Sequence, residues 1–201
     1  MTSVTISPKQ VSELRARTGA GMMDCKRALE ESGGDMDRAS EILRKKGIAK
    51  AEKRAGRTAA QGVVVSYIHH NGQVGVLVEL NCETDFVART EGFQQLARDI
   101  ALHVASADPI GIAPEDIPAD LLERERRIAE EQAAAEGKPE NVRAKIVEGK
   151  IKKFVAERTL TEQPYVRDDT KTVGQLIKEV SGKVGEAVSV RRFARFKVGE
   201  A

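Results

Sequence analysis

The chain changes character at Gly62-Val63-Val64-Val65-Ser66-Tyr67-Ile68, where a run of β-branched residues follows a long stretch of helical patterns. β-Branched side chains favour strands because their restricted χ1 angles suit a pleated sheet better than a helix. Asn71-Gly72 follows, which is the strongest short signal of a hairpin turn, and Val74 to Leu80 supplies a returning strand. We therefore expect an antiparallel sheet that begins at Gly62.

Helical patterns fill the residues before this sheet. Ser7 can cap a first helix, Pro8 suits its first position, and Gln10 can reach back to close a capping box. Glycines mark the ends of the helices, and Asp35 can cap a later one. The predicted helices run from Pro8 to a break at Thr18-Gly19-Ala20-Gly21, from Met22 to Glu31, and from Asp35 to Gly47. We expect these three helices to form one small module.

The remainder of the chain alternates helices with strands. Gly137-Lys138-Pro139 separates two charged helical segments, Ala119–Glu136 and Pro139–Leu160, so these should fold back on each other as a helical hairpin. The other predicted elements are helices at Glu91–Ala107 and Val173–Val184, an extended segment at Pro164-Tyr165-Val166 and a last strand at Val188–Val198. This order predicts the α+β class. The predicted parts are a three-helix N-terminal module (1–48), a linker or exposed helix (49–61), the first part of an α+β core with an antiparallel sheet (62–118), the helical hairpin (119–160) and the second part of the core (161–201).

The composition favours a folded protein that works by binding. Basic residues number 33 and acidic residues 31, so the net charge is +2 and no global excess of positive charge exists for coating nucleic acid. Aromatic residues make up 3% of the chain and Trp is missing, so an exposed aromatic side chain would stand out as a contact. No apolar run is long enough to span a membrane, and Met1 to Gln10 lacks the pattern of a signal peptide. We expect a cytoplasmic protein.

The sequence shows no set of residues that carries enzyme chemistry. Gly182-Lys183 is followed by Val184, so it lacks the Ser or Thr of a P-loop. Cys25 and Cys82 lie far apart outside any CxxC or Cys/His cluster, so no zinc site is indicated and each is expected to be a small core residue. Asp85 could pair with a His for acid–base work, but nothing else of a catalytic constellation accompanies it. We expect no enzymatic activity, no metal and no cofactor.

A turn is predicted at Thr84-Asp85-Phe86-Val87, because this segment follows one predicted strand and precedes a helix. Thr84 or Asp85 can cap the segment that follows. The residues alone leave two interpretations open. In the first, which they favour, the Asp is a cap and Phe86 is a core residue. In the second, the turn protrudes and contacts a partner.

Two long segments are distinctive, Leu14-Arg15-Ala16-Arg17-Thr18-Gly19-Ala20-Gly21-Met22-Met23-Asp24-Cys25-Lys26-Arg27-Ala28-Leu29 and Glu79-Leu80-Asn81-Cys82-Glu83-Thr84-Asp85-Phe86-Val87-Ala88-Arg89. Three shorter ones accompany them, namely Glu136-Gly137-Lys138-Pro139, Glu148-Gly149-Lys150-Ile151-Lys152-Lys153-Phe154 and Gln163-Pro164-Tyr165-Val166. All of these segments resemble bacterial elongation factor Ts. The resemblance runs from end to end in the same order, and the two long segments are specific to it.

This resemblance implies a guanine nucleotide exchange factor whose partner is the GTPase elongation factor Tu. It implies a ubiquitin-associated-like N-terminal module and a single copy of the core, through which a homodimer forms with two partner molecules bound. Within the turn from Thr84 to Val87, Phe86 would be an apolar wedge near the partner's Mg²⁺ site and Asp85 a neighbouring polar contact. A second set of residues matches positions that touch the GTPase, namely Arg15, Met22 and Met23. The resemblance implies no direct contact with nucleotide, no requirement for nucleic acid and no cofactor.

The size of one side chain limits what Phe86 can do alone. Fully burying a Phe contributes about 1.5–3 kcal/mol, which corresponds to about tenfold to a little over a hundredfold in an equilibrium. A second contact is therefore expected, and Met22 and Met23 suit it because methionine adapts to a partner's surface. Core packing is the alternative for these two residues. Adjacent helical positions point about 100° apart, so at least one of the two should be exposed.

Two further alternatives stay open. The helical hairpin can be a solvated charged excursion or a second docking arm. The chain can also be an RNA- or ribosome-associated binding protein, which would show a steep salt dependence of binding. The basic residues that would serve this function are Lys50, Lys53, Arg54, Arg57 and those in the strand from Arg191 to Lys197.

Overall fold

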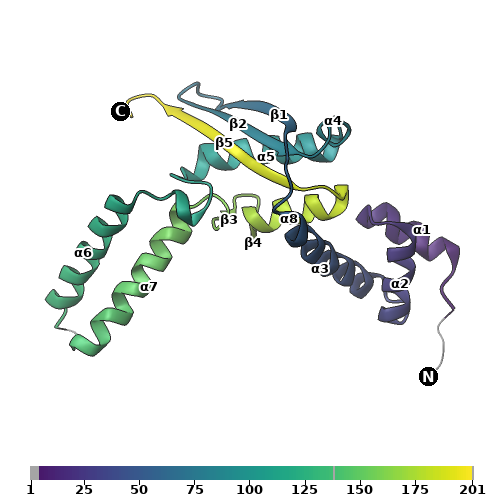
Figure 1. Ribbon diagram of the computed structural model, residues 1–201, viewed down its shortest axis with the longest axis horizontal. Coiled ribbons are helices and arrows are strands. Elements are labelled where there is room, and N and C mark those ends of the chain that lie inside the picture. The colour runs from purple at the N-terminus through teal and green to yellow at the C-terminus, as the bar shows by residue number, and fades with distance from the viewer. Residues whose placement is uncertain (1–4, 138, 201) are drawn as a thin grey trace. The chain divides into compact units, whose positions relative to one another are not determined.

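The computed structural model describes residues 5–137 and 139–200. Helices alternate with antiparallel strands, which confirms the α+β class (Figure 1). The elements are α1 (Pro8–Thr18), α2 (Met22–Ser32), α3 (Met36–Arg54), β1 (Gln61–Ile68), β2 (Val74–Cys82), α4 (Asp85–Ala88), α5 (Glu91–Ala107), the short 3₁₀ helix η1 (Pro114–Asp116), α6 (Ala119–Ala135), α7 (Glu140–Arg158), β3 (Pro164–Tyr165), β4 (Asp168–Thr172), α8 (Val173–Val184) and β5 (Val188–Lys197).

The chain divides into two compact units, each assembled from segments that lie apart in the sequence. The first unit comprises Met1–Val63, Leu80–Leu96 and Ile177–Ser189, and the second comprises Val64–Glu79, Ala97–Leu176 and Val190–Ala201. The first unit therefore contains α1 to α4 together with most of α8, and the second contains α6, α7, β3 and β4. The division into five parts that the sequence suggested stays a prediction.

The N-terminal helices begin where their caps predict. The Gln10 N–H donates to Ser7 Oγ over 3.3 Å, and Gln10 Oε1 accepts from the Ser7 N–H over 3.0 Å, which completes the capping box of α1. At α3, Asp35 Oδ1 accepts from the N–H groups of residues 37 and 38, each over 2.9 Å. The three helices pack around one apolar cluster in which Leu14, Cys25 and Leu29 are fully buried, so Cys25 is the core residue that the sequence suggested.

The predicted end of the third helix at Gly47 is wrong, because α3 continues to Arg54. Gly47 instead lies where α3 meets α8. The Gly182 position is so close that an added Cβ would fall 2.9 Å from both the carbonyl carbon and the carbonyl oxygen of Gly47. The missing side chain of Gly182 therefore allows the two backbones to approach within the first unit, whereas a Cβ added at Gly47 would meet only Gly182 Cα, at 3.8 Å. Helical continuation also makes residues 49–54 part of α3, so only the residues after Arg54 connect it to the sheet.

The sheet has the strand order β1-β2-β5. Its hairpin turns where Asn71-Gly72 predicts: Gly72 has φ of +68°, and Asn71 Oδ1 accepts from the Gln73 N–H over 3.0 Å. The Val198 N–H donates to the Gln73 carbonyl over 2.9 Å, which sets the end of β5 beside the start of β2. Along β2 the buried residues alternate with less buried ones, as expected of a strand with one face in the core. The residues buried in this way are Val76, Val78, Leu80 and Cys82.

In the second unit, α6 and α7 contact each other, and Lys150 Nζ on α7 donates to Gln132 Oε1 on α6 over 2.8 Å. The predicted break between these helices includes Lys138, which lies outside the described residues. A buried polar group lies at α5, where His103 Nε2 is 2.9 Å from Gln163 Oε1 and His103 Nδ1 accepts from the Val166 N–H over 3.2 Å. Over residues 5–137 and 139–200, none of the helices combines the length and the apolar character that crossing a membrane requires.

Candidate functional site

Phe86 projects from the first turn of α4 with 77% of its surface exposed. The interpretation that made Phe86 a core residue is therefore wrong. Leaving a Phe in water forgoes about 1.5–3 kcal/mol of the stabilisation that burial would give. In a chain with so few aromatic residues, this side chain marks α4 as a candidate contact surface.

The turn before α4 is held by its own side chains. Thr84 is the cap: its backbone is extended, and its hydroxyl oxygen accepts from the Val87 N–H over 3.4 Å. Asp85 is not the cap but lies in the first turn, where a carboxylate is favoured by the helix dipole. Its Oδ2 is 2.7 Å from Arg89 Nη2, so this pair spans the helix. Val87 is half-buried.

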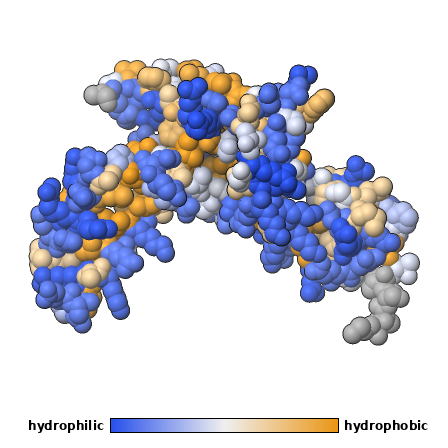
Figure 2. Space-filling view, in the orientation of Figure 1, coloured by the Kyte–Doolittle hydropathy of each residue, from blue (hydrophilic) through white to orange (hydrophobic). Residues whose placement is uncertain are grey.

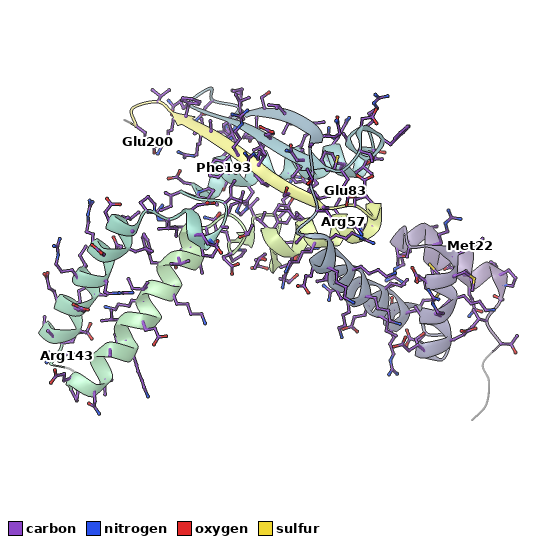
Figure 3. The ribbon with its side chains drawn as sticks, in the orientation of Figure 1. Met22, Arg57, Glu83, Arg143, Phe193 and Glu200 are labelled. Atoms are coloured by element: carbon purple, nitrogen blue, oxygen red, sulfur yellow. The ribbon has the colours of Figure 1, made fainter. Side chains whose placement is uncertain are left out.

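Two glutamates join the turn to the chain after α8, and we call this arrangement the Glu83–Glu186 clasp. Glu186 Oε2 accepts from the N–H groups of Glu83 and Thr84 over 3.1 and 3.0 Å, and Glu186 Oε1 accepts from the Thr84 hydroxyl over 2.6 Å. In return, Glu83 Oε1 accepts from the Ala187 N–H over 2.7 Å. Arg57 Nη1 lies 3.5 Å from the same Glu83 oxygen, and both residues are labelled in Figure 3. Each carboxylate thus binds the backbone beside the other.

Sequence reasoning did not find Glu186. Its partners are 102 and 103 positions away along the chain, and no local pattern connects them. Glu83 lay within a distinctive segment, but nothing in that segment indicated what its carboxylate binds.

Cys82 lies fully buried behind the turn, and its thiol donates to the Thr84 carbonyl over 3.1 Å. Burial raises the pKa of the Cys82 thiol, and the negative charge of Glu186 raises it further. The thiol is therefore protonated at neutral pH and serves as a small core group rather than as a nucleophile.

A second exposed apolar surface lies at the start of α2. Met22 and Met23 are 55% and 62% exposed, so both of them, not only one, face solvent. Asp24 follows them; its hydrogen bonds with Arg27 and with Lys50, the latter over 3.1 Å, hold the pKa of its carboxyl below its usual value. Arg15, in the last turn of α1, is also exposed. These residues belong to the same compact unit as the Phe86 turn, and Met22 is labelled in Figure 3.

Most of the basic residues that would serve nucleic-acid binding have acidic neighbours. The ion pairs are Lys50 with Asp24, Arg57 with Glu83, Arg192 with Glu79, Arg195 with Asp108 and Glu200, and Lys197 with Glu200. A carboxylate within 4 Å neutralises much of the field that a phosphate would otherwise meet. Three of the basic residues of β5 are therefore paired with carboxylates from outside the strand.

The second unit has an apolar sheet face. Val64 and Ile68 of β1, Leu77 of β2, Phe196 of β5 and Val198 directly after it are all exposed, and four of these five line one groove that also includes Gly75. Figure 2 shows apolar surface over the strands. Exposed faces of antiparallel sheets are usually polar, so this face is a candidate interface.

Metal binding finds no support within residues 5–137 and 139–200, where no cluster of three or more His, Cys, Asp or Glu side chains has a geometry suited to an ion.

Comparison with known proteins gives one consistent result. A family model described as "Elongation factor TS" matches residues 37–200. The protein named "Elongation factor Ts" of Desulforamulus reducens is 57% identical over 195 residues, which cover 97% of this chain and 90% of that protein. The proteins of the same name from Desulfosudis oleivorans and Thermosipho melanesiensis are each 54% identical, over 98% and 97% of this chain and over 99% and 100% of their own lengths.

Proposed function

Because this chain belongs to the elongation factor Ts family, and is thus a translation elongation factor, we propose that it acts as a guanine nucleotide exchange factor for elongation factor Tu. The observation that carries the proposal is the exposed Phe86 on a turn held by the Glu83–Glu186 clasp. The protein acts in the cytoplasm, requires no cofactor or nucleic acid, and does not touch the nucleotide itself.

An exchange factor works through a difference in affinity. It must bind the nucleotide-free GTPase more tightly than the nucleotide-bound one, and by linkage the bound factor then weakens nucleotide binding by the same ratio. Nucleotide release is the resulting shift in population. This mechanism needs exposed contact groups of fixed geometry and no catalytic residues on the factor.

The Phe86 turn supplies the contact that discriminates between the two states. Phe86 enters the GTPase beside its Mg²⁺ site and Asp85 makes a neighbouring polar contact, so that the ion is displaced and the phosphates are held less tightly. The half-buried Val87 and the capping Thr84 support the turn. Full burial of one Phe accounts for about tenfold to a little over a hundredfold in affinity.

The start of α2 supplies the remaining affinity. Met22 and Met23 are exposed side by side, and their flexible thioether side chains fit an irregular partner surface. Arg15 adds a charged contact nearby in the sequence. Two contact regions in one compact unit make the affinity of the whole larger than Phe86 alone can provide.

The exposed sheet face of the second unit pairs with the same face of a second copy. In a two-fold dimer the same face of each copy meets its counterpart, so one apolar face can form the whole interface. Phe196 and Val198 are mostly exposed and do not pack into the chain's own core. The helices α6 and α7 remain open between a solvated excursion and a further docking arm.

The alternative of an RNA- or ribosome-associated binding protein is less well supported, because its basic residues are largely paired with carboxylates. Release of labelled GDP from elongation factor Tu, with and without this protein, separates the two. Acceleration supports the exchange function, whereas unchanged release combined with strongly salt-dependent RNA binding supports the alternative.

A further inference from the structure

The carboxylate of Glu186 accepts hydrogen bonds from the chain around Thr84. Its Oε2 receives two backbone N–H groups and its Oε1 receives the Thr84 hydroxyl, all within 3.1 Å. Hydrogen bonds to a charged acceptor are roughly twice as strong as neutral ones. Three such bonds on one half-buried carboxylate therefore fix the local backbone strongly.

These bonds set the conformation from which Phe86 projects. The Thr84 hydroxyl donates to Glu186, so its lone pairs remain free to accept the Val87 N–H that caps α4. The helix α4 has only four residues, far fewer than a helix needs to be stable by itself. Phe86 is mostly exposed and cannot be oriented by packing of its own ring. Its direction therefore depends on the backbone of α4, which the cap held by Glu186 fixes together with the packing of Val87 and Ala88.

The backbone that carries Glu186 is itself held in place at the end of α8. Gly185 ends α8 with φ of +79°, a left-handed conformation that favours glycine. The Ser181 hydroxyl donates to the Glu186 carbonyl over 2.5 Å, and the next N–H, of Ala187, is bound by Glu83. The end of α8 is thus a rigid support for the carboxylate.

We infer that Glu186 is a positioning residue for nucleotide exchange: it holds the Phe86 turn in the orientation that enters the partner, without touching the partner's nucleotide. This inference rests on the proposed function. Glu186→Gln keeps the size of the side chain but replaces one acceptor oxygen by an NH₂ group, which must face either the two backbone N–H donors or the Thr84 hydroxyl. The lost charge and the lost acceptor should lower the rate of GDP release about tenfold or more.

A double-mutant cycle distinguishes positioning from general stability. The rate of labelled GDP release from elongation factor Tu is measured with the parent protein, Glu186→Gln, Phe86→Ala and the double variant. The expected result is a loss of about tenfold for Glu186→Gln in the parent and less than about twofold in the Phe86→Ala background, because an orientation matters only while the ring is present. Glu52→Gln is the matched control: it removes the charge of an exposed glutamate 2.9 Å from Lys178 in the same unit and should leave the rate unchanged.

The outcomes separate the inference from the function on which it rests. If the parent protein accelerates release and Phe86→Ala does not, but Glu186→Gln behaves like the parent, the positioning role is wrong and the exchange function stands. Losses that multiply in the double variant also contradict it, because Glu186 would then act independently of Phe86. If the parent protein itself has no effect, the exchange function fails. Should Glu186→Gln lose its urea-induced unfolding transition, Thr84→Val removes the same hydroxyl–carboxylate bond and takes its place in the cycle.

Discussion

Gly182 of α8 lies directly against Gly47 of α3, where an added Cβ would fall 2.9 Å from the Gly47 carbonyl group. This contact joins the last of the N-terminal helices to α8, the helix that ends two residues before Glu186. Both proposed contact regions for the partner, the start of α2 and the Phe86 turn, are therefore connected through packed elements of one unit. A disturbance at this glycine pair should affect the stability of that unit.

Gly182→Ala should destabilise the protein, because the methyl group meets backbone atoms that cannot rotate away. Overpacking of this kind costs about 1–3 kcal/mol in the free energy of unfolding, measured by urea denaturation. Gly149→Ala in α7 is the matched control, since nothing lies within 4 Å of its added Cβ. It should stabilise the protein by about 0.5–1 kcal/mol through helix propensity. Equal effects of the two substitutions would contradict the close approach at Gly182.

The imidazole of His103 should titrate below the range of an ordinary histidine. Burial lowers the pKa of His103 from its usual 6.5, opposed by the hydrogen bond with Gln163. The unfolded chain therefore binds a proton at a higher pH than the folded chain does, so stability is complete above about pH 6.5 and declines as the pH falls toward the folded value. Proton NMR of the imidazole C–H groups measures the pKa, and urea denaturation between pH 7 and 5 measures the slope. A pKa above 6.5 would contradict the buried neutral ring.

Phe196→Asp should convert a dimer into a monomer. Phe196 is 69% exposed on the apolar sheet face, and a carboxylate there would be buried without a partner in a two-fold interface, which is strongly unfavourable. Molar mass from light scattering should fall by half. Val166→Asp, at an exposed valine of the same unit outside that face, should leave the mass unchanged. A parent protein that is already monomeric would rule out the proposed dimer.

The double substitution Met22→Ala and Met23→Ala should weaken binding to nucleotide-free elongation factor Tu without unfolding the protein. Each side chain, if buried by the partner, contributes up to about 1.5–3 kcal/mol, so a loss of tenfold or more in affinity is expected. The free energy of unfolding should barely change, because both side chains are exposed in the free protein. Titration calorimetry measures the affinity. An unchanged dissociation constant would remove these residues from the interface.

Local signals in the sequence predicted most of the elements. The Ser7 capping box, the Asn71-Gly72 turn and the periodicity of Glu91–Ala107 each depend on neighbours in the chain, and each is confirmed. Gly47 was misinterpreted because its partner is Gly182, which no local pattern reveals. Glu186 was missed for the same reason. The exposure of Phe86 could not be derived from residue type, because an apolar side chain after a strand is ordinarily buried.

The most direct test of the exchange mechanism is the rate of labelled GDP release from elongation factor Tu with Phe86→Ala. The parent protein should accelerate release, and the variant should lose about tenfold to a hundredfold of that acceleration. Val166→Ala, which shortens another exposed apolar side chain, should retain the parent rate. A folded Phe86→Ala protein that exchanges nucleotide as fast as the parent would contradict the role of the Phe86 turn.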